Sequence, residues 1–198
     1  THLKLSPNVG PCTFVFPSAP VRPVTCNYYL PMPRWFDMKM LGFGASYDPP
    51  RHGCSLESAE TSNYWVTNAI RMLQEEEGLP PERIAVGGFS QGGAMALLTA
   101  LTYEHQLAGC VVLSGLVFGQ QEKANQTVSR GLRVFWGHGT NDDILEISLQ
   151  DEGLKELQNL GASVTGMRYP MGHAWHPREI QDVSNFLNQA FSATDARS

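Results

Sequence analysis

Hydrophobic residues along this chain fall into two alternating patterns. Short apolar runs rich in Val, Ile and Phe alternate with longer segments in which apolar residues recur at helical spacing. This alternation is typical of a mostly parallel sheet that is covered by helices on both faces. We therefore predict strands at 12–19, 83–90, 107–115, 132–139 and 163–170, and helices at 55–78, 91–106, 145–161 and 178–194.

Residues 17–57 do not follow this alternation. The segment is rich in Pro and Gly and has no clear period. Loops of this length in compact domains usually line or cover a functional site, but a surface crossing that includes a short hairpin fits the pattern equally well. No internal repeat or linker divides the sequence, so we expect one domain over residues 1–198.

Composition and charge narrow the classes of partner. The net charge is -5 and there is no basic run, which argues against nucleic acid because neutralising phosphates requires clustered Lys and Arg. The longest apolar stretch, 107–119, is shorter than the roughly 20 residues that span a bilayer. Asn125 begins a glycosylation sequon, which has meaning only in a secreted protein.

The four cysteines have neither CxxC nor Cys/His ligand spacing. We therefore expect no metal site and a core thiol at Cys110, which lies inside a predicted strand. Reduced thiols also favour a cytoplasmic location.

One short motif carries candidate chemistry. Ser90 lies between Gly88 and Gly92, at the end of a predicted strand and directly before a predicted helix. A turn this sharp strains the serine backbone, and side chains at both flanking positions are expected to clash. The helix N-terminus presents unpaired amides, so the Gln91 N–H is the first candidate to stabilise an oxyanion. The alternative is a Gly-rich turn that carries a surface serine.

A nucleophilic serine needs a histidine as base and a carboxylate that orients it. In an open α/β sheet these groups gather at the carboxyl ends of the strands, where the segments 138–143 and 169–176 arrive. Asp142 and Asp143 compete for the acid role. For the base, His173 competes with His176, which is the better candidate for a helix cap because it precedes Pro177. Spacing alone does not separate the two aspartates, and His138 is expected to brace the acid loop.

Five blocks of this sequence carry a wider resemblance: “FPSAPVRPVTCNYYLPMPRWFD” (16–37), “RIAVGGFSQGGAMAL” (83–97), “LAGCVVLSG” (107–115), “HGTNDDI” (138–144) and “YPMGH” (169–173). In this order they resemble the acyl-protein thioesterase, lysophospholipase and small carboxylesterase family, which has the α/β-hydrolase fold. The resemblance implies that Ser90 is the nucleophile, Asp142 the acid and His173 the base, with the Gln91 amide in the oxyanion hole.

Two features depart from that family. Asp143 stands where the family usually has proline, and a second carboxylate there could disturb Asp142. The family's first strands and its His-Gly-x-Gly-Asp loop, which supplies a second oxyanion N–H, have no counterpart, and 12–19 corresponds to the fourth strand of the fold. The expectation is therefore an α/β-hydrolase domain without its N-terminal strands.

The resemblance implies a serine hydrolase that cleaves acyl thioesters or esters through an acyl-enzyme, with no cofactor. Acylated proteins, lipids or esters are the expected partners, which leaves peripheral membrane contact open and the oligomeric state undefined. An apolar acyl channel would be lined by residues before the first long helix and after the third strand, with ordinary core packing as the alternative: Trp35, Phe36, Leu30, Met32, Leu116, Val117 and Phe118. A catalytically silent hydrolase fold that serves as a binding module is the alternative function.

Overall fold

A four-stranded parallel sheet forms the centre of the computed structural model, which describes residues 12–40, 53–118 and 124–195. The strand order is β3-β4-β5-β6. Each strand lies within a range predicted from the sequence: β3 (Ala85–Phe89), β4 (Gly109–Leu113), β5 (Arg133–Gly139) and β6 (Ser163–Tyr169). These four strand predictions are confirmed.

The predicted strand at 12–19 is wrong. Residues 12–20 form no strand, and residues 12–18 are all exposed. A β pattern gives an extended segment, but a strand forms only where a neighbour supplies hydrogen bonds, and this segment pairs with none of the described strands. Within the described ranges, β3 is therefore an edge of the sheet.

The helices confirm the predicted helical segments. Four long helices connect or flank the strands: α2 (Leu56–Glu76), α3 (Gln91–Thr102), α5 (Ile147–Asn159) and α6 (Pro177–Asp195). Three short elements were not predicted: η1 (Thr25–Asn27), η2 (Pro81–Arg83) and α4 (Gln126–Ser129). Asn125 of the sequon caps α4, because its side-chain oxygen accepts the N–H groups of Thr127 and Val128 at 3.1 and 3.4 Å.

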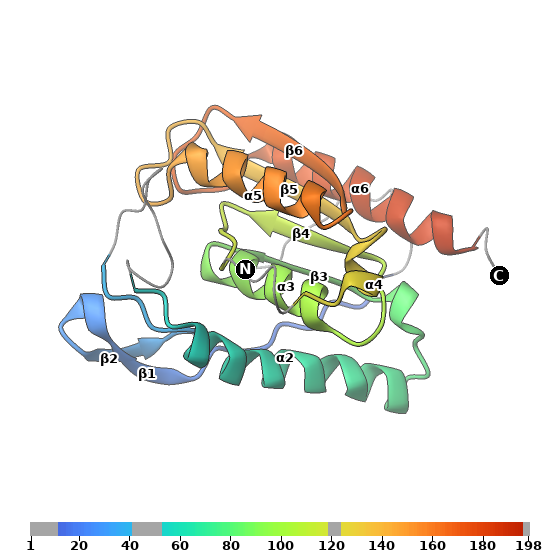
Figure 1. Cartoon of the computed structure of the whole chain (residues 1–198), viewed down its shortest axis with the longest axis horizontal. Coiled ribbons are helices and arrows are strands. Elements are labelled where there is room, and N and C mark those ends of the chain that lie inside the picture. Colours follow the sequence, from blue (N-terminus) through green and yellow to red (C-terminus); the bar gives the residue numbers. More distant parts are fainter. Residues whose placement is uncertain (1–11, 41–52, 119–123, 196–198) are drawn as a thin grey trace.

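The hairpin expected as one option for the long segment is present. β1 (Val21–Val24) and β2 (Leu30–Pro33) pair antiparallel, and Figure 1 shows them at the lower left, at the side towards which the arrowhead of β6 points. Positions 41–52 of the long segment lie outside the described residues. Several large apolar side chains of the hairpin are exposed: Val21, Tyr28, Tyr29, Leu30 and Met32.

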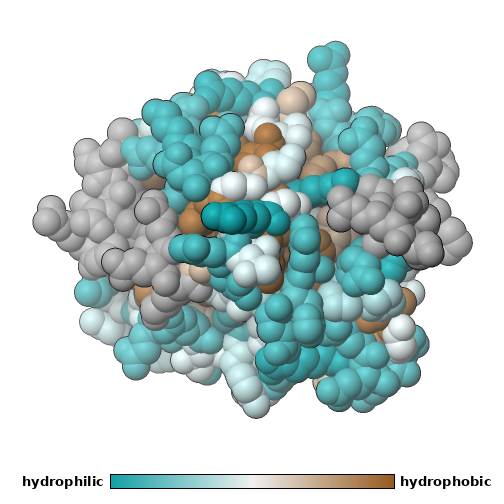
Figure 2. All heavy atoms as spheres, turned by 45° about the vertical axis from the view of Figure 1, so that its right-hand side comes forward, coloured by the Kyte–Doolittle hydropathy of each residue, from teal (hydrophilic) through white to brown (hydrophobic). Residues whose placement is uncertain are grey.

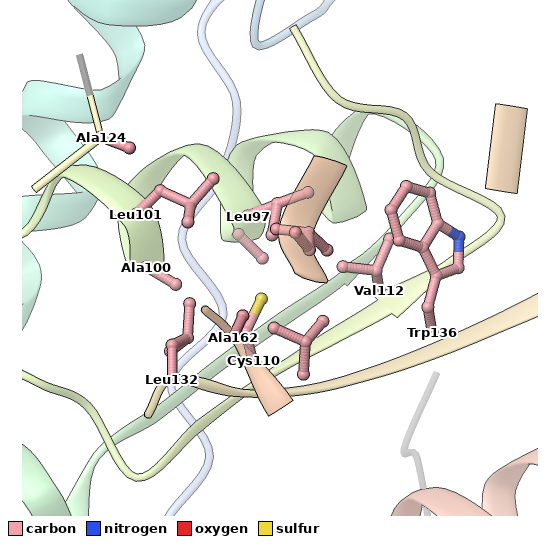
Figure 3. Packing of buried hydrophobic residues seen from close by; sticks show 12 residues of the cluster. Leu97, Ala100, Leu101, Cys110, Val112, Ala124, Leu132, Trp136 and Ala162 are labelled. Atoms are coloured by element: carbon pink, nitrogen blue, oxygen red, sulfur yellow. The ribbon is translucent and has the colours of Figure 1, made fainter. Parts of the chain in front are cut away.

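Alternate residues of the sheet pack against helices on opposite faces. Cys110, Val112 and Trp136 pack with α3 and α5 residues, as Figure 3 shows for Leu97 and Leu101 of α3. Residues Val111, Leu113 and Phe135 pack instead against α6. Cys110 is fully buried, as predicted, and burial raises the pKa of its thiol. The sheet is thus the middle of three layers, with α3 and α5 on one face and α6 on the other.

The outer surface is more polar. On the face drawn in Figure 2, hydrophilic side chains predominate, and hydrophobic ones show as patches between them. None of the helices within 12–40, 53–118 and 124–195 combines the length and the apolarity that crossing a membrane requires.

The contact between α5 and β5 yields a stability prediction. A Cβ atom added at Gly153 would lie 2.4 Å from the indole of Trp136, which is 0% exposed. We expect Gly153→Ala to destabilise the fold by about 1–3 kcal/mol, because overpacking exceeds the gain of about 1 kcal/mol that alanine brings to a helix. Urea unfolding measures the change, with Glu152→Ala on the exposed side of α5 as the control. A more stable Gly153→Ala variant would contradict the prediction.

Candidate active site

Ser90 occupies a strained turn between β3 and α3. Its backbone has φ 55 and ψ -120, a left-handed conformation that costs a non-glycine residue of the order of 1–3 kcal/mol. Its N–H donates to the Leu113 carbonyl at 2.9 Å, and its carbonyl accepts the Ala94 N–H at 3.1 Å. These bonds fix the turn to the end of β4 on one side and to α3 on the other.

The two glycines that flank Ser90 differ in whether a side chain would fit at their positions. A Cβ atom at Gly88 would lie 2.3 Å from the carbonyl carbon of Gly92, so the predicted clash is confirmed at Gly88. A Cβ atom at Gly92 would meet no described atom within 4 Å, so the same prediction is wrong there. The constraint is the close approach of the Gly92 main chain to the position of a Gly88 side chain.

His173 lies between the other two predicted residues. Its Nε2 is 2.9 Å from Ser90 Oγ, and its Nδ1 is 2.8 Å from Asp142 Oδ2. In the neutral tautomer that this arrangement favours, Nδ1–H donates to the carboxylate and Nε2 accepts the serine hydroxyl. The structure thus brings Ser90, His173 and Asp142 into one row, although 83 and 31 positions of sequence separate the pairs.

Hydrogen bonds hold the Asp142 carboxylate in a fixed orientation. Oδ1 accepts the N–H groups of Ile144 and Leu145 at 3.0 and 2.8 Å, which leaves Oδ2 for His173. The side chain is 0% exposed, whereas Asp143 is an exposed residue. Of the two competing aspartates, Asp142 is therefore the one that contacts the imidazole, and Asp143 is left in contact with water.

His138 supports the loop that carries Asp142, as expected. Its Nε2–H donates to the Leu145 carbonyl at 2.8 Å and lies 3.5 Å from Asp142 Oδ2. Burial lowers the pKa of His138, against the opposing effects of the Leu145 carbonyl and the Asp142 carboxylate. A neutral His138 that donates one proton at a fixed position is consistent with a structural rather than a proton-transferring role.

The acid loop, which follows β5 and carries Asp142, and the base loop, which follows β6 and carries His173, continue the pairing of β5 with β6. The N–H groups of Thr140 and Asn141 donate to the carbonyls of Tyr169 and Met171 at 2.9 and 3.0 Å. A Cβ atom at Gly139 would lie 2.5 Å from the Met171 carbonyl oxygen, so only glycine allows this approach. The two loops therefore leave the sheet as one hydrogen-bonded unit.

The first turn of α3 provides free N–H groups and a positive partial charge beside Ser90. Gln91 is the first residue of this helix, so its N–H belongs to the groups that have no partner within the helix. Such N–H groups and the positive end of the helix dipole favour negative charge near Ser90. The ring of Phe89, the residue before Ser90, packs on the His173 imidazole with 4.8 Å between the centroids.

Only some of the predicted channel residues come together. Phe36, Leu116 and Phe118 are buried in one cluster, against which Trp35 packs, and the Phe36 and Phe118 rings meet edge to face at 4.7 Å. Val117 packs instead with the cluster around Trp136. Leu30 and Met32 lie on the exposed hairpin. The structure thus unites Trp35, Phe36 and Leu116 but not Leu30 or Val117.

Sequence reasoning did not identify the role of the Gln91 side chain. Its Oε1 accepts the Trp35 N–H at 3.0 Å and its Nε2 donates to the Phe36 carbonyl at 3.2 Å. No local signal marks these bonds, because the partners lie 56 and 55 positions earlier in the chain.

His176 caps α6, as predicted, and does not contact Ser90. Its Nδ1 accepts the Arg178 N–H at 3.1 Å, and its own N–H donates to Glu179 Oε2 at 3.3 Å, which together form a reciprocal cap. Glu179 is 0% exposed, and its Oε1 has no hydrogen-bond partner among the described residues. Burial raises the pKa of Glu179 to about 7, and the nearby Asp182 adds to the increase, whereas the His176 N–H opposes it.

This geometry defines a class of protein, the α/β-hydrolase-type esterases, in which a serine at a sharp strand-to-helix turn lies beside a histidine and a buried carboxylate. The chain belongs to the phospholipase/carboxylesterase family, whose sequence profile matches residues 3–191. The fold expected from the sequence is confirmed.

Curated relatives include both thioesterases and carboxylesterases. An acyl-protein thioesterase 1 of Aspergillus fumigatus is 31% identical over 92% of this chain and 78% of its own length. A probable carboxylesterase of Oryza sativa subsp. japonica is 33% identical over 93% of this chain and 68% of its own. These relatives and the family place the chain among the esterase and thioesterase hydrolases.

Solved structures share this fold. SOBER1 of Arabidopsis thaliana has a TM-score of 0.76 and 28% identity, with 89% of this chain and 82% of that chain covered. Zea mays acyl-protein thioesterase 2, at 23% identity, shares the fold with a TM-score of 0.72 over 88% of this chain and 80% of its own.

The buried carboxyl group of Glu179 predicts a pH dependence of stability. The unfolded chain releases this proton near pH 4.5 and the folded chain near pH 7, so the free energy of unfolding falls as pH rises between these values. At about 1.4 kcal/mol per pH unit, the loss reaches up to about 3 kcal/mol. We expect Glu179→Gln to flatten this slope in urea unfolding, and the exposed-site control Glu152→Gln to keep it. Parallel pH curves for the wild type and Glu179→Gln would contradict the prediction.

Proposed function

We propose that this protein is a serine hydrolase that cleaves acyl thioesters or oxygen esters, with Ser90 as nucleophile, His173 as general base and Asp142 as the acid that orients it. The observation that carries this proposal is the continuous row of hydrogen bonds, at 2.9 and 2.8 Å, from Ser90 Oγ through His173 to Asp142. These distances allow proton transfer without rearrangement of the side chains.

In the first half of the reaction, Ser90 Oγ attacks the acyl carbonyl while its proton passes to His173 Nε2. The buried Asp142 carboxylate stabilises the imidazolium that forms. The Gln91 N–H donates to the oxyanion of the tetrahedral intermediate, where one such donor contributes about 10²- to 10³-fold in rate. His173 then protonates the leaving thiolate or alkoxide, and an acyl-enzyme remains.

In the second half, His173 takes a proton from water, and the resulting hydroxide attacks the acyl-enzyme carbonyl. The intermediate collapses, Ser90 recovers its proton from His173, and the carboxylic acid leaves. His173 carries the transferred protons in both halves, and no oxidation state changes, so the proposed reaction needs no redox partner.

The relatives and the residues near α3 support this substrate class. The relatives named above are an acyl-protein thioesterase and a probable carboxylesterase, and both kinds of ester make the same demands on these three residues. The partly buried Trp35 is held next to α3 through Gln91, which favours substrates with an apolar acyl group. A cytoplasmic location stays a prediction.

A fluorophosphonate probe tests the nucleophile directly. We expect stoichiometric labelling of the wild type and none of Ser90→Ala, because the probe reacts only with a serine that a base has activated. Ser163→Ala, an exposed serine at the start of β6, is the control and should label as the wild type does. No labelling of the wild type would support the alternative of a silent binding module.

A matched pair of variants tests the acid. Asp142→Asn should lower kcat by about 10⁴-fold, because the amide cannot hold the reactive tautomer of His173 or stabilise its cation. Asp143→Asn should have little effect, since that side chain is exposed and lies outside the row. Hydrolysis of a p-nitrophenyl ester measures both. A larger loss with Asp143→Asn would show that the wrong aspartate has been chosen.

A further inference from the structure

The side chain and the backbone of Gln91 serve different parts of the site. The backbone N–H lies at the free N-terminus of α3, directly after Ser90. The carboxamide binds the main chain of two adjacent residues, with Oε1 on the Trp35 N–H at 3.0 Å and Nε2 on the Phe36 carbonyl at 3.2 Å. Gln91, the residue directly after the nucleophile, is therefore hydrogen-bonded to the segment that carries two aromatic side chains.

The opposite edge of this segment is fixed to α2. The Ser62 hydroxyl donates to the Trp35 carbonyl, and the Ser58 hydroxyl accepts the Asp37 N–H at 3.0 Å. These bonds hold the segment to α2 but do not connect it to Ser90 or to α3. On the α3 side, the Gln91 carboxamide supplies the polar bonds of Trp35 and Phe36, in addition to the apolar packing of Phe36 on α3.

The two aromatic residues occupy different environments. Phe36 is 1% exposed and belongs to the buried cluster, whereas Trp35 is only partly buried and packs against the edge of that cluster. A wall that must contact an apolar chain needs a large side chain that is not already enclosed by the core. Trp35 meets this requirement, and the bond from its own N–H to Gln91 limits its movement.

We propose that the Gln91 side chain is a positioning residue that determines selectivity for long acyl chains, by fixing the Trp35–Phe36 segment in register with Ser90. The inference rests on the proposed hydrolase function and adds to it the part of the site that senses the acyl group. A short acyl group ends before it reaches this wall, so its hydrolysis depends on the row of Ser90, His173 and Asp142 and much less on the carboxamide.

The chemistry of the carboxamide explains why glutamine suits this position. One end accepts and the other donates, which matches an N–H and a carbonyl on consecutive residues. Glutamate of the same shape accepts from the Trp35 N–H but has no proton for the Phe36 carbonyl, and methionine removes both of these hydrogen bonds. Gln91→Glu and Gln91→Met thus form a graded series with almost unchanged volume.

The experiment compares selectivity in this series. The ratio of kcat/KM for a decanoyl to that for an acetyl p-nitrophenyl ester should fall by about tenfold to a hundredfold in Gln91→Met, since misplacing a wall by about 1 Å has effects of this size. Gln91→Glu should fall between Gln91→Met and the wild type. Gln158→Met, the same change at an exposed position of α5, is the control and should keep the wild-type ratio.

Hydrogen exchange of the peptide that contains Trp35 gives a readout independent of activity. Faster exchange in Gln91→Met than in the wild type and in Gln158→Met supports the proposed contact. An unchanged ratio of kcat/KM, whether both esters lose activity equally or neither does, overturns the inference even where the fluorophosphonate probe still labels Ser90. Absence of probe labelling in the wild type overturns the proposed function, so the two failures are distinguishable.

Discussion

Parallel pairing of β3, β4, β5 and β6 is the constraint on which the site depends. Gly88 lies opposite Val112, and Val112 lies opposite Trp136, so the strands reach their carboxyl ends at the same edge of the sheet. Ser90 follows the first of these ends, and the acid loop follows the third. The base loop follows β6, so it must cross the ends of β5 and β4 to reach Ser90. It does so as part of a rigid unit, because main-chain hydrogen bonds join it to the acid loop before either loop turns away from the sheet.

The strained backbone of Ser90 persists because the surrounding structure stabilises it. A left-handed serine is unfavourable by a few kcal/mol at most. Against this stand two main-chain hydrogen bonds of Ser90 and the burial of almost all of α3, whose residues from Gly93 to Leu101 are buried. Burying a single leucine contributes a comparable 1.5–3 kcal/mol. The helix therefore holds the turn in a conformation that exposes the hydroxyl, and the absence of a side chain at Gly88 lets the helix approach closely enough to do so.

Most of the sheet and the position of Ser90 could be predicted from the sequence, because hydrophobic period and strand-to-helix order are local signals. Asp142 and His173 were implied by the family resemblance. Spacing could not choose between Asp142 and Asp143; the choice depends on which carboxylate meets the N–H groups of the loop that follows, a matter of three-dimensional geometry. The strand at 12–19 failed for a related reason: extended propensity is local, whereas pairing is not. The Gln91 side chain was missed because its partners are distant in sequence and consist of main-chain atoms, which carry no residue-type signal.

The surroundings of Asp142 explain how the chain accommodates the aspartate at 143. A buried carboxylate is stable as an anion only when hydrogen-bond donors replace the water it has lost. Two loop amides and His173 supply these donors, and His138 Nε2, whose proton is donated to the Leu145 carbonyl, lies 3.5 Å from Oδ2. Asp143 is exposed, so water screens its charge, and it takes none of these donors. In the proposed mechanism, the anion that faces the His173 cation is therefore held by the fold itself, and a neighbouring charge in solvent changes its energy little.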